Sequence, residues 1–468
     1  MHDIFLVVRK EKRFLLFLLI VSFLIRAIFF GLFLSHDKNY FTLDSNTYHR
    51  VAIKIFEGKG IIDVDDKPHF YRVPGYSIFF ATIYKLFEIN EVLALWIQIF
   101  FTSFLPFLIF FLSIILFSTK ILVAKASSIF SSFHIGYVLF SGLMMTEGFF
   151  SLFFIIFLIF FLYDFNFFFS KSIQSKSISY KNMFLGGLFL GIASMFRPVG
   201  HCLIILSIIL LLFEKKHFMV KIKKSFVLFV SWSLIVFWWI LRNYFLTGYI
   251  FFHTLPGIHF LKHISIPIDM QINKHNFHES HAKIWNEWND LIKKKEKIEK
   301  RNLIDIEKCI IGERLAFSYM LKYPILTIKR AFCNFFKTNF FIYSYKILEI
   351  NGYKKHWEID DKKSFFNNIL DRYLNIPIKN NLLRIIIWLE IFFINFIFIG
   401  FIFFIIKSFF DINLLYVTLK ILPFIGFMIF ITFACGFARL RLPIEPFLFI
   451  SSFYFWINLF KRSKKVEQ

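Results

Sequence analysis

Long apolar runs recur along the chain and constrain what it can fold into. The first, Phe14 to Leu34, follows a basic N-terminal segment and is about as long as a helix that spans a bilayer. Of the 468 residues, 57% are hydrophobic and only 18% are charged. A soluble protein carries about 45–50% apolar residues and about 25% charge, so this composition excludes a soluble enzyme, a disordered protein and a secreted disulfide scaffold. We predict an integral membrane protein.

The apolar runs predict an all-α polytopic membrane protein, a bundle of about ten transmembrane helices. Basic residues precede the first run and end the chain, so we place both termini in the cytoplasm. Alternation then puts lysine-bearing loops on the cytoplasmic side, as the positive-inside rule requires. These lysines are Lys120, Lys125, Lys171, Lys176, Lys181, Lys215, Lys216, Lys221, Lys223 and Lys224. The predicted spans are residues 14–34, 93–117, 121–140, 147–163, 183–197, 199–213, 225–241, 385–406, 414–434 and 443–460.

This layout divides the chain into three regions. Residues 1–260 form an N-terminal transmembrane module with spans one to seven, and its outer loop, residues 35–92, is the expected catalytic loop. Residues 261–383 form an extracytoplasmic or interfacial helical segment. Residues 384–468 carry the last spans and a basic cytoplasmic tail.

Two pieces of the outer segment have the pattern of amphipathic helices. A charged helical run extends from Ile284 to Lys308, and an aromatic piece interrupted by basic residues extends from Pro324 to Tyr345. Periodic basic and aromatic residues suit a helix that lies in the membrane interface. We therefore expect extracytoplasmic amphipathic helices beside the bundle.

The net charge of +24, from 55 basic and 31 acidic residues, has a simple explanation in a membrane protein. The basic residues lie in short segments between apolar runs, where they orient the spans in the bilayer. We therefore expect no nucleic-acid partner. The four cysteines are scattered without CxxC spacing and indicate neither a disulfide framework nor a metal cage.

The outer loop after the first span carries a carboxylate on a helical face. Asp44, Tyr48 and Ala52 recur at i, i+4 and i+8, so they share one face of a helix. A carboxylate there is suited to line a cavity at the membrane surface. The alternative is that Asp44 caps the N-terminus of this helix, and the two roles are compatible.

A second acid and several arginines are expected at the same outer level. Glu147 follows an apolar stretch. It either faces the bundle with a cationic partner, or it interacts favourably with the dipole at the N-terminus of a helix. Separate segments deliver arginines, each of which alone is explained by contact with headgroups. Together they predict a cationic pocket suited to a phosphate, which guanidinium binds in a fork geometry. These arginines are Arg197, Arg242, Arg439 and Arg441.

Short motifs occur in a fixed order along most of the chain. They are Asp44-x3-Tyr48-x3-Ala52, Gly58-x-Gly60, Arg72-x-Pro74-x-Tyr76, Thr146-Glu147, Gly187-x3-Gly191-x5-Arg197-Pro198, Arg242-Asn-Tyr244-x3-Gly248 and Arg439-x-Arg441-x-Pro443. This order, over residues 14–260 and 380–460, resembles the GT-C superfamily of polytopic glycosyltransferases. The branch it resembles holds protein O-mannosyltransferases, aminoarabinose transferases and RgtA/B/C/D-like proteins of family 39.

The resemblance implies a GT-C-like helical bundle in the cell membrane with an extracytoplasmic active site. It implies a polyprenyl-phosphate-linked sugar as donor, a lipid, glycan or protein as acceptor, and inverting transfer. Asp44 matches the aspartate expected to act as general base, and Glu147 matches the second acidic position, a catalytic residue expected to orient the acceptor or the sugar. The implied substrate-binding residues are Tyr48, Arg72, Arg197, Arg242, Tyr244, Arg439 and Arg441.

Cofactors and other functions receive weaker support from the sequence. The acidic residue that often follows the first-loop aspartate in the family is replaced by Ser45, so no metal ligand set is predicted and a divalent cation has little support. Histidines gather between His253 and His281 without an HExxH motif, and we interpret them as solvated. A transporter or flippase for a lipid-linked glycan is the alternative function, and a structural membrane subunit is the third.

Overall fold

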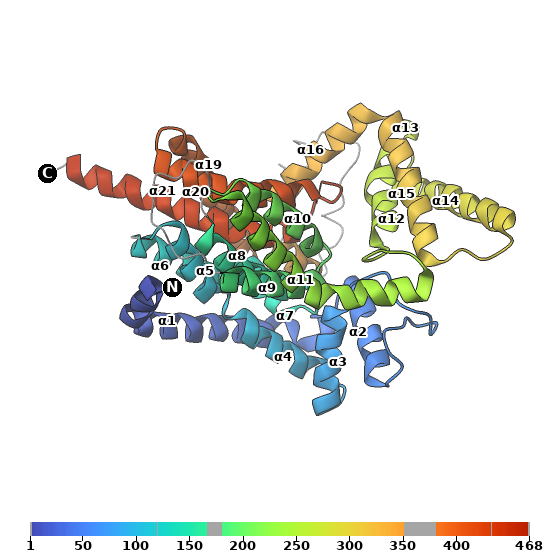
Figure 1. The fold of residues 1–468 in the computed structure, drawn as a ribbon, viewed down its shortest axis with the longest axis horizontal. Helices are drawn as coiled ribbons and strands as arrows, with labels where there is room; N and C mark the ends of the chain where they lie inside the picture. The colour runs from blue at the N-terminus through green and yellow to red at the C-terminus, as the bar shows by residue number, and fades with distance from the viewer. Residues whose placement is uncertain (1, 119, 166–179, 351–380, 432, 467–468) are drawn as a thin grey trace.

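The computed structural model describes residues 2–118, 120–165, 180–350, 381–431 and 433–466 (Figure 1). Within these ranges every regular element is a helix, and one isolated β-bridge joins Ile62 to Pro68. The all-α prediction is therefore confirmed. Lys171, Lys176 and residues 351–380 of the predicted outer segment lie outside the described residues.

The helical bundle has helices at all ten predicted positions, but the predicted count of ten spans is not confirmed. Seven helical stretches in the described ranges are long and apolar enough to cross a bilayer, and an eighth is the pair α6 and α7, bent by 48°. Two shorter helices, α9 with 17 residues and α10 with 14, follow. The chain is a multi-pass membrane protein. Its bundle helices are α1 (His2–Phe29), α4 (Glu91–Thr102), α5 (Leu105–Leu116), α6 (Ile121–Phe133), α7 (Ile135–Gly142), α8 (Glu147–Asp164), α9 (Tyr180–Phe196), α10 (Val199–Leu212), α11 (Phe218–Thr247), α19 (Asn381–Ser408), α20 (Ile412–Ile431) and α21 (Glu445–Val466).

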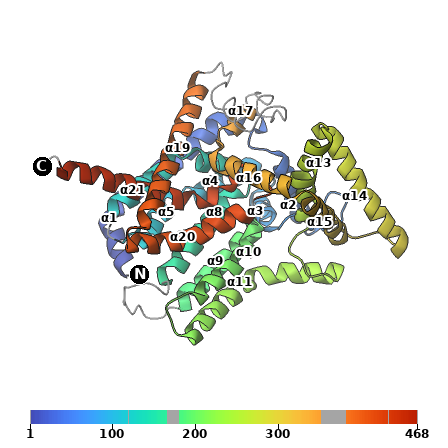
Figure 2. The same ribbon diagram turned by 90° about the horizontal axis from the view of Figure 1, so that it is seen from above.

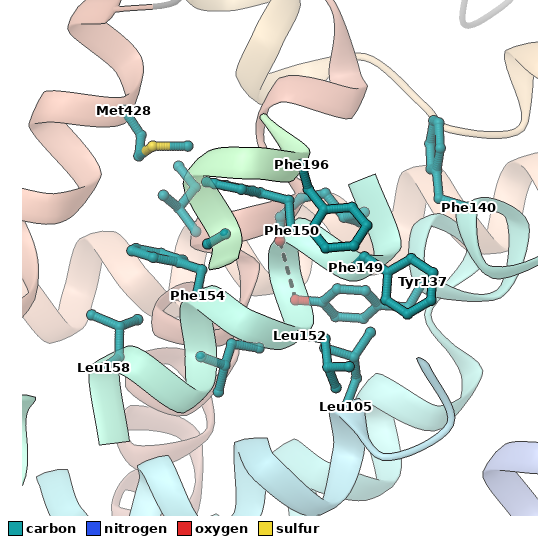
Figure 3. Packing of buried hydrophobic residues seen from close by; sticks show 14 of the residues in the cluster. Leu105, Tyr137, Phe140, Phe149, Phe150, Leu152, Phe154, Leu158, Phe196 and Met428 are labelled. Atoms are coloured by element: carbon teal, nitrogen blue, oxygen red, sulfur yellow. Dashed lines mark hydrogen bonds between the residues drawn. The ribbon is translucent and has the colours of Figure 1, made fainter. Parts of the chain in front are cut away.

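Phenylalanine rings of α8 fill the centre of the bundle (Figure 3). The rings of Phe150 and Phe154 stack with centroids 5.7 Å apart, and Phe149 lies 5.1 Å from Phe196 of α9. The hydroxyl of Tyr137 donates a hydrogen bond to the carbonyl oxygen of Leu442 at 3.1 Å, drawn as a dashed line in Figure 3. A buried tyrosine is stable when its hydroxyl has such a partner. The bond links α7 to the turn before α21.

Small residues let α9 and α11 approach each other closely. A Cβ atom added at Gly187 would lie 2.4 Å from the carbonyl oxygen of Leu228, and one added at Gly191 would lie 3.0 Å from that of Trp232. Glycines four residues apart allow this kind of close backbone contact between membrane helices. The Gly187-x3-Gly191 motif thus has a packing role.

The loop between α1 and α4 holds two further helices, α2 (Leu43–Phe56) and α3 (Gly75–Phe87), which lie against each other. The helix that carries Asp44 was expected from the sequence. Gly75, at the start of α3, touches the end of α9, because a Cβ atom there would lie 2.4 Å from the carbonyl oxygen of Met195. This contact places the start of α3 beside the segment that carries Arg197.

The helices of the outer segment form a group, most of which lies at the end of the molecule opposite to the two termini, and the last helix of the group, Pro324–Phe340, runs back toward the bundle (Figure 1 and Figure 2). The predicted charged run from Ile284 to Lys308 is not one helix, because the chain turns at Lys300 with a φ of 54°. The elements of the group are α12 (Leu255–Phe260), the π-helix η3 (Leu261–Ser265), α13 (Ile266–Asn273), α14 (Phe277–Glu299), α15 (Asp305–Lys322) and α16 (Pro324–Phe340).

Helix α16 has an exposed apolar face. Ile325, Ile328 and Phe332 are 80%, 69% and 61% exposed, and they recur at helical spacing beside the basic residues Lys329 and Arg330. This pattern is typical of a helix in the membrane interface, and that placement stays a prediction.

One lysine assigned to a cytoplasmic loop is instead buried. Lys224 lies within α11, and its Nζ binds both carboxylate oxygens of Glu214 at 2.7 and 2.9 Å. Its side chain is 2% exposed and that of Glu214 is fully buried. The positive-inside rule counts charges and cannot tell which of them the fold pairs internally.

Candidate active site

Asp44 stands in the first turn of α2 but does not cap it. The N-cap is Thr42, whose hydroxyl accepts a hydrogen bond from the backbone N–H of Ser45 at 3.3 Å. The Ser45 hydroxyl accepts one from the N–H of Thr42 at 2.8 Å and completes a capping box. The capping role considered for Asp44 is therefore wrong, and its carboxylate is available for other contacts.

The Asp44 carboxylate is held between two guanidinium groups from distant parts of the chain. Arg72 Nη2 lies 2.7 Å from Oδ1, and Arg439 Nη1 lies 2.8 Å from Oδ2. Arg439 belongs to the short 3-10 helix η5 (Ala438–Leu440) ahead of α21. The Asp44 side chain keeps 28% of its surface exposed, so an incoming molecule can reach it.

Contacts between α2 and the segment before α3 fix the position of Arg72. Its Nη1 donates a hydrogen bond to the hydroxyl of Tyr48 at 2.8 Å, and its guanidinium lies over the Tyr48 ring at 4.8 Å. The Tyr48 ring meets the Tyr76 ring edge-on at 5.1 Å. Ser77 donates a hydrogen bond to the carbonyl oxygen of Tyr48 at 3.0 Å. The predicted residues Tyr48 and Arg72 therefore both belong to the cluster around Asp44.

Glu147 is the first residue of α8 and shares a contact to Arg439 with Asp44. Arg197 Nη1 is 2.9 Å from Glu147 Oε1, and Arg439 Nε is 3.8 Å from the same oxygen. The Glu147 side chain is only 2% exposed. Both predicted environments of this carboxylate, a helix N-terminus and a cationic partner in the bundle, are present. Arg439 links the two acids, because it touches Asp44 and Glu147 with different nitrogens.

The cluster carries an excess of positive charge. Three guanidinium groups face two carboxylates, which leaves one unmatched positive charge. Burial alone would raise the pKa of Asp44, but the charges of Arg439 and Arg72 outweigh it and hold that pKa well below its usual range. Asp44 is therefore ionised in the free protein. The net positive charge of the cluster suits it to bind an anion.

Three predicted site residues lie outside this cluster. Arg242 donates hydrogen bonds to the carbonyl oxygens of Ile61 and His69 at 2.7 and 3.2 Å, so it holds the outer loop. Arg441 is fully buried, where it binds Glu445 at 2.6 Å and backbone carbonyls at the end of α16. Tyr244 is 45% exposed on α11. The contacts of Arg242 and Arg441 favour roles in positioning the site or the fold.

Other residues near the cluster were not identified from the sequence. Burial raises the pKa of Tyr345, while the nearby charge of Arg439 acts to lower it. Burial also lowers the pKa of His259 to about 4, and this imidazole lies close enough to Arg72, Arg439 and Asp44 to feel their charges. The histidines expected to be solvated are in part half-buried beside the site. A single sequence gives no signal that brings these segments together.

The carboxylates of the cluster do not fit a divalent cation. Both oxygens of Asp44 and one oxygen of Glu147 already lie against guanidinium groups. A dication there would have to displace these arginines and would meet the excess positive charge of the cluster. We assign no metal to Asp44 and Glu147 and derive no step through one.

The fold, unlike the sequence, matches known proteins. No protein family and no curated protein matches the sequence. The oligosaccharyltransferase of Archaeoglobus fulgidus in the apo form superimposes with a TM-score of 0.53 at 12% identity, over 98% of this chain and 52% of that one. The archaeal oligosaccharyltransferase AglB from the same organism, in complex with an inhibitory peptide and a dolichol-phosphate, gives 0.52 at 11% identity, over 97% and 51%. The chain therefore shares the fold of these oligosaccharyltransferases and has the GT-C-like helical bundle that was predicted.

This chain spans about half the length of the oligosaccharyltransferase chains it matches. ArnT from Cupriavidus metallidurans bound to undecaprenyl phosphate is also similar, with a TM-score of 0.35 at 12% identity over 96% of this chain and 78% of that one. In this chain the outer loop, the start of α8, the end of α9 and the turn before α21 converge, and each contributes one or more charged residues.

Proposed function

We propose that this chain is a membrane glycosyltransferase. It transfers a sugar from a polyprenyl-phosphate carrier to an acceptor hydroxyl, with inversion, at the extracytoplasmic face. The observation that carries the proposal is the Asp44 carboxylate, accessible and held between Arg72 and Arg439. A base beside an anion-binding group is what this reaction requires. The oligosaccharyltransferase of the same fold, solved with a dolichol-phosphate, supports a lipid-linked donor.

The proposed reaction is a single displacement. Asp44 accepts the proton of the acceptor hydroxyl while its oxygen bonds to the anomeric carbon of the donor. The bond from that carbon to the phosphate oxygen breaks at the same time, and the electron pair leaves with the polyprenyl phosphate. Attack opposite to the leaving group inverts the anomeric configuration. No covalent sugar–protein intermediate is involved.

The arginines have two roles in this scheme. Arg439 and Arg72 are paired with Asp44 in the free protein, and this pairing makes the carboxylate a weak base. A donor phosphate that binds these guanidinium groups draws them from Asp44 and raises its basicity when both substrates are present. The same groups then stabilise the negative charge that develops on the leaving phosphate.

Glu147 positions the cationic side of the site. It contacts Arg197 and Arg439, and its 2% exposure makes it a poor candidate for direct contact with an acceptor. We therefore assign Glu147 to orientation of these two arginines, and we assign proton transfer to Asp44. The acceptor is a hydroxyl of a lipid, a glycan or a protein.

The proposal is tested by incubating the purified full-length protein, in lipid vesicles, with a panel of polyprenyl-phosphate sugars and candidate acceptors. We expect release of free polyprenyl phosphate that depends on an acceptor. Movement of the sugar lipid across the vesicle membrane without any release would contradict the proposal and favour the flippase.

A further inference from the structure

A second cluster of side chains lies beside the proposed active site, and the proposed reaction uses none of them. His259 at the end of α12, His263 in the π-helix η3 and Cys435 before η5 place their ligand atoms within 4.8 Å of one another. Sγ of Cys435 is 4.0 Å from Nδ1 of His259. All three side chains are half-buried.

The two histidines lie on one face of a continuous helical stretch. They are four residues apart, and their ring centroids are 5.2 Å apart. The stretch is fixed at Gly257, where a Cβ atom would lie 2.6 Å from the carbonyl oxygen of Cys309. The π-helix at His263 adds weight to a functional interpretation, because single π-turns are frequent at functional sites.

The segment that carries Cys435 is held by α16. The Asn334 amide donates hydrogen bonds to the carbonyl oxygens of Phe433 and Ala434 at 3.1 and 2.8 Å. Thr338 donates one to the carbonyl oxygen of Cys435 at 3.4 Å. The thiol is therefore presented to the histidines by a backbone that neighbouring side chains fix.

We infer that His259, His263 and Cys435 form a binding site for a zinc ion. Two imidazoles and one thiolate are a donor set that suits Zn²⁺ and does not suit Mg²⁺ or Ca²⁺, which prefer oxygen. Tetrahedral zinc with ordinary bond lengths places such donors about 3.4–3.6 Å apart. Side-chain rotations that draw the ligand atoms together by about 1 Å complete the site, with water in the fourth position.

The zinc ion would pin the outer segment to the turn that carries Arg439. His263 packs against Phe437 with ring centroids 5.7 Å apart, and the Arg439 guanidinium lies over the same ring at 5.4 Å. The ion thus joins η3 to the residues just ahead of η5. This role concerns the position of Arg439 and involves no step of the proposed reaction.

The test measures metal binding directly. The full-length protein in detergent is freed of metal with a chelator and titrated with Co²⁺ and Zn²⁺. We expect one ion per chain and a thiolate-to-cobalt charge-transfer absorption that Zn²⁺ abolishes. Cys435→Ser removes this absorption, whereas the matched control Cys333→Ser, on α16, retains it. Absence of stoichiometric binding, or binding without the thiolate band, would overturn the inference.

A second readout does not require a variant to fold. Zn²⁺ is added to the wild-type protein, and alkylation of each cysteine by a maleimide is followed by mass spectrometry of its peptides. We expect zinc to slow modification of Cys435 at least tenfold and to leave that of Cys333 unchanged. Equal rates for Cys435 with and without zinc would contradict the site. Neither readout depends on glycosyl transfer, so failure of the zinc site and failure of the proposed function are distinguishable.

Discussion

Arg439 lies 2.8 Å from the carboxylate of Asp44, although 395 positions separate the two residues in the chain. Arg439 also reaches Glu147, at 3.8 Å, so the turn before α21 completes a charged cluster that begins in the outer loop. This relationship gives the first prediction. Arg439→Ala should lower kcat about 10²–10³-fold, the effect typical of removing one preorganised group that stabilises transition-state charge.

A matched control separates this effect from general loss of charge. Arg314→Ala removes an exposed arginine from α15 and should leave kcat unchanged. The measurement is the initial rate of polyprenyl-phosphate release at saturating donor. Equal rates for Arg439→Ala and wild type would remove Arg439 from the mechanism.

The contact between α3 and α9 should be sensitive to a single methyl group. Gly75→Ala places a Cβ atom 2.4 Å from the carbonyl oxygen of Met195, so α3 has to shift and should move the Arg72 segment. We expect a loss of about 1–3 kcal/mol in the free energy of unfolding, together with reduced activity. The control is Gly426→Ala in α20, where the added atom meets nothing within 4 Å and should be neutral or slightly stabilising. Thermal unfolding in detergent compares the two, and equal melting temperatures would contradict the packing argument.

The buried pair of Lys224 and Glu214 predicts a stability effect away from the site. Lys224→Met leaves the Glu214 carboxylate buried without its partner, which costs about 3–5 kcal/mol. The double variant Lys224→Met/Glu214→Leu removes both charges and should recover most of this loss. Denaturant unfolding measures the three proteins. A double variant as unstable as Lys224→Met would show that the pair is not the cause.

The stability should fall as the pH decreases below neutrality, in part through His69. Burial lowers the pKa of His69 to about 4, and its Nε2 accepts a hydrogen bond from the backbone N–H of Arg72 at 3.2 Å. The unfolded chain protonates this imidazole below about pH 6.5, whereas the folded chain does so only near pH 4. Neutral His69 therefore contributes fully to the free energy of unfolding above pH 6.5. This contribution falls as the pH decreases, by up to about 2 kcal/mol at pH 5.

This pH effect is measured by unfolding at pH 7.5 and pH 5. His69→Gln cannot titrate and should show a smaller loss between the two pH values than wild type. The same loss in both proteins would assign the effect to other groups.

The sequence predicted the bundle well, because apolar runs of membrane length allow few alternatives. It also proposed a site from residues that the fold does bring together, namely Asp44, Tyr48, Arg72, Glu147, Arg197 and Arg439. Arg441 carries the same pattern as Arg439 two residues earlier, yet it turns into the bundle and binds Glu445. Which of two neighbouring arginines faces a site depends on the local turn, and a motif does not encode that.

The outer segment was predicted less well for a physical reason. The arrangement of its helices depends on contacts between residues far apart in the sequence, such as Asn334 with Ala434 and His259 with Cys435. Periodicity reports only the local helix, so it indicated the amphipathic α16 and missed the break at Lys300 and the meeting of histidines with cysteine. The burial of Lys224 within α11 was also missed, since its partner Glu214 lies on another segment.

The role of Asp44 as general base is tested by the rate of sugar transfer by Asp44→Asn, with Asp37→Asn as control. Asp37 is an exposed carboxylate in the same outer loop, and the same substitution there should leave the rate unchanged. Asp44→Asn keeps the shape of the side chain and loses the base, so we predict a fall in kcat of about 10²–10⁴-fold in protein that still folds. A folded Asp44→Asn protein that transfers sugar at the wild-type rate would contradict the account.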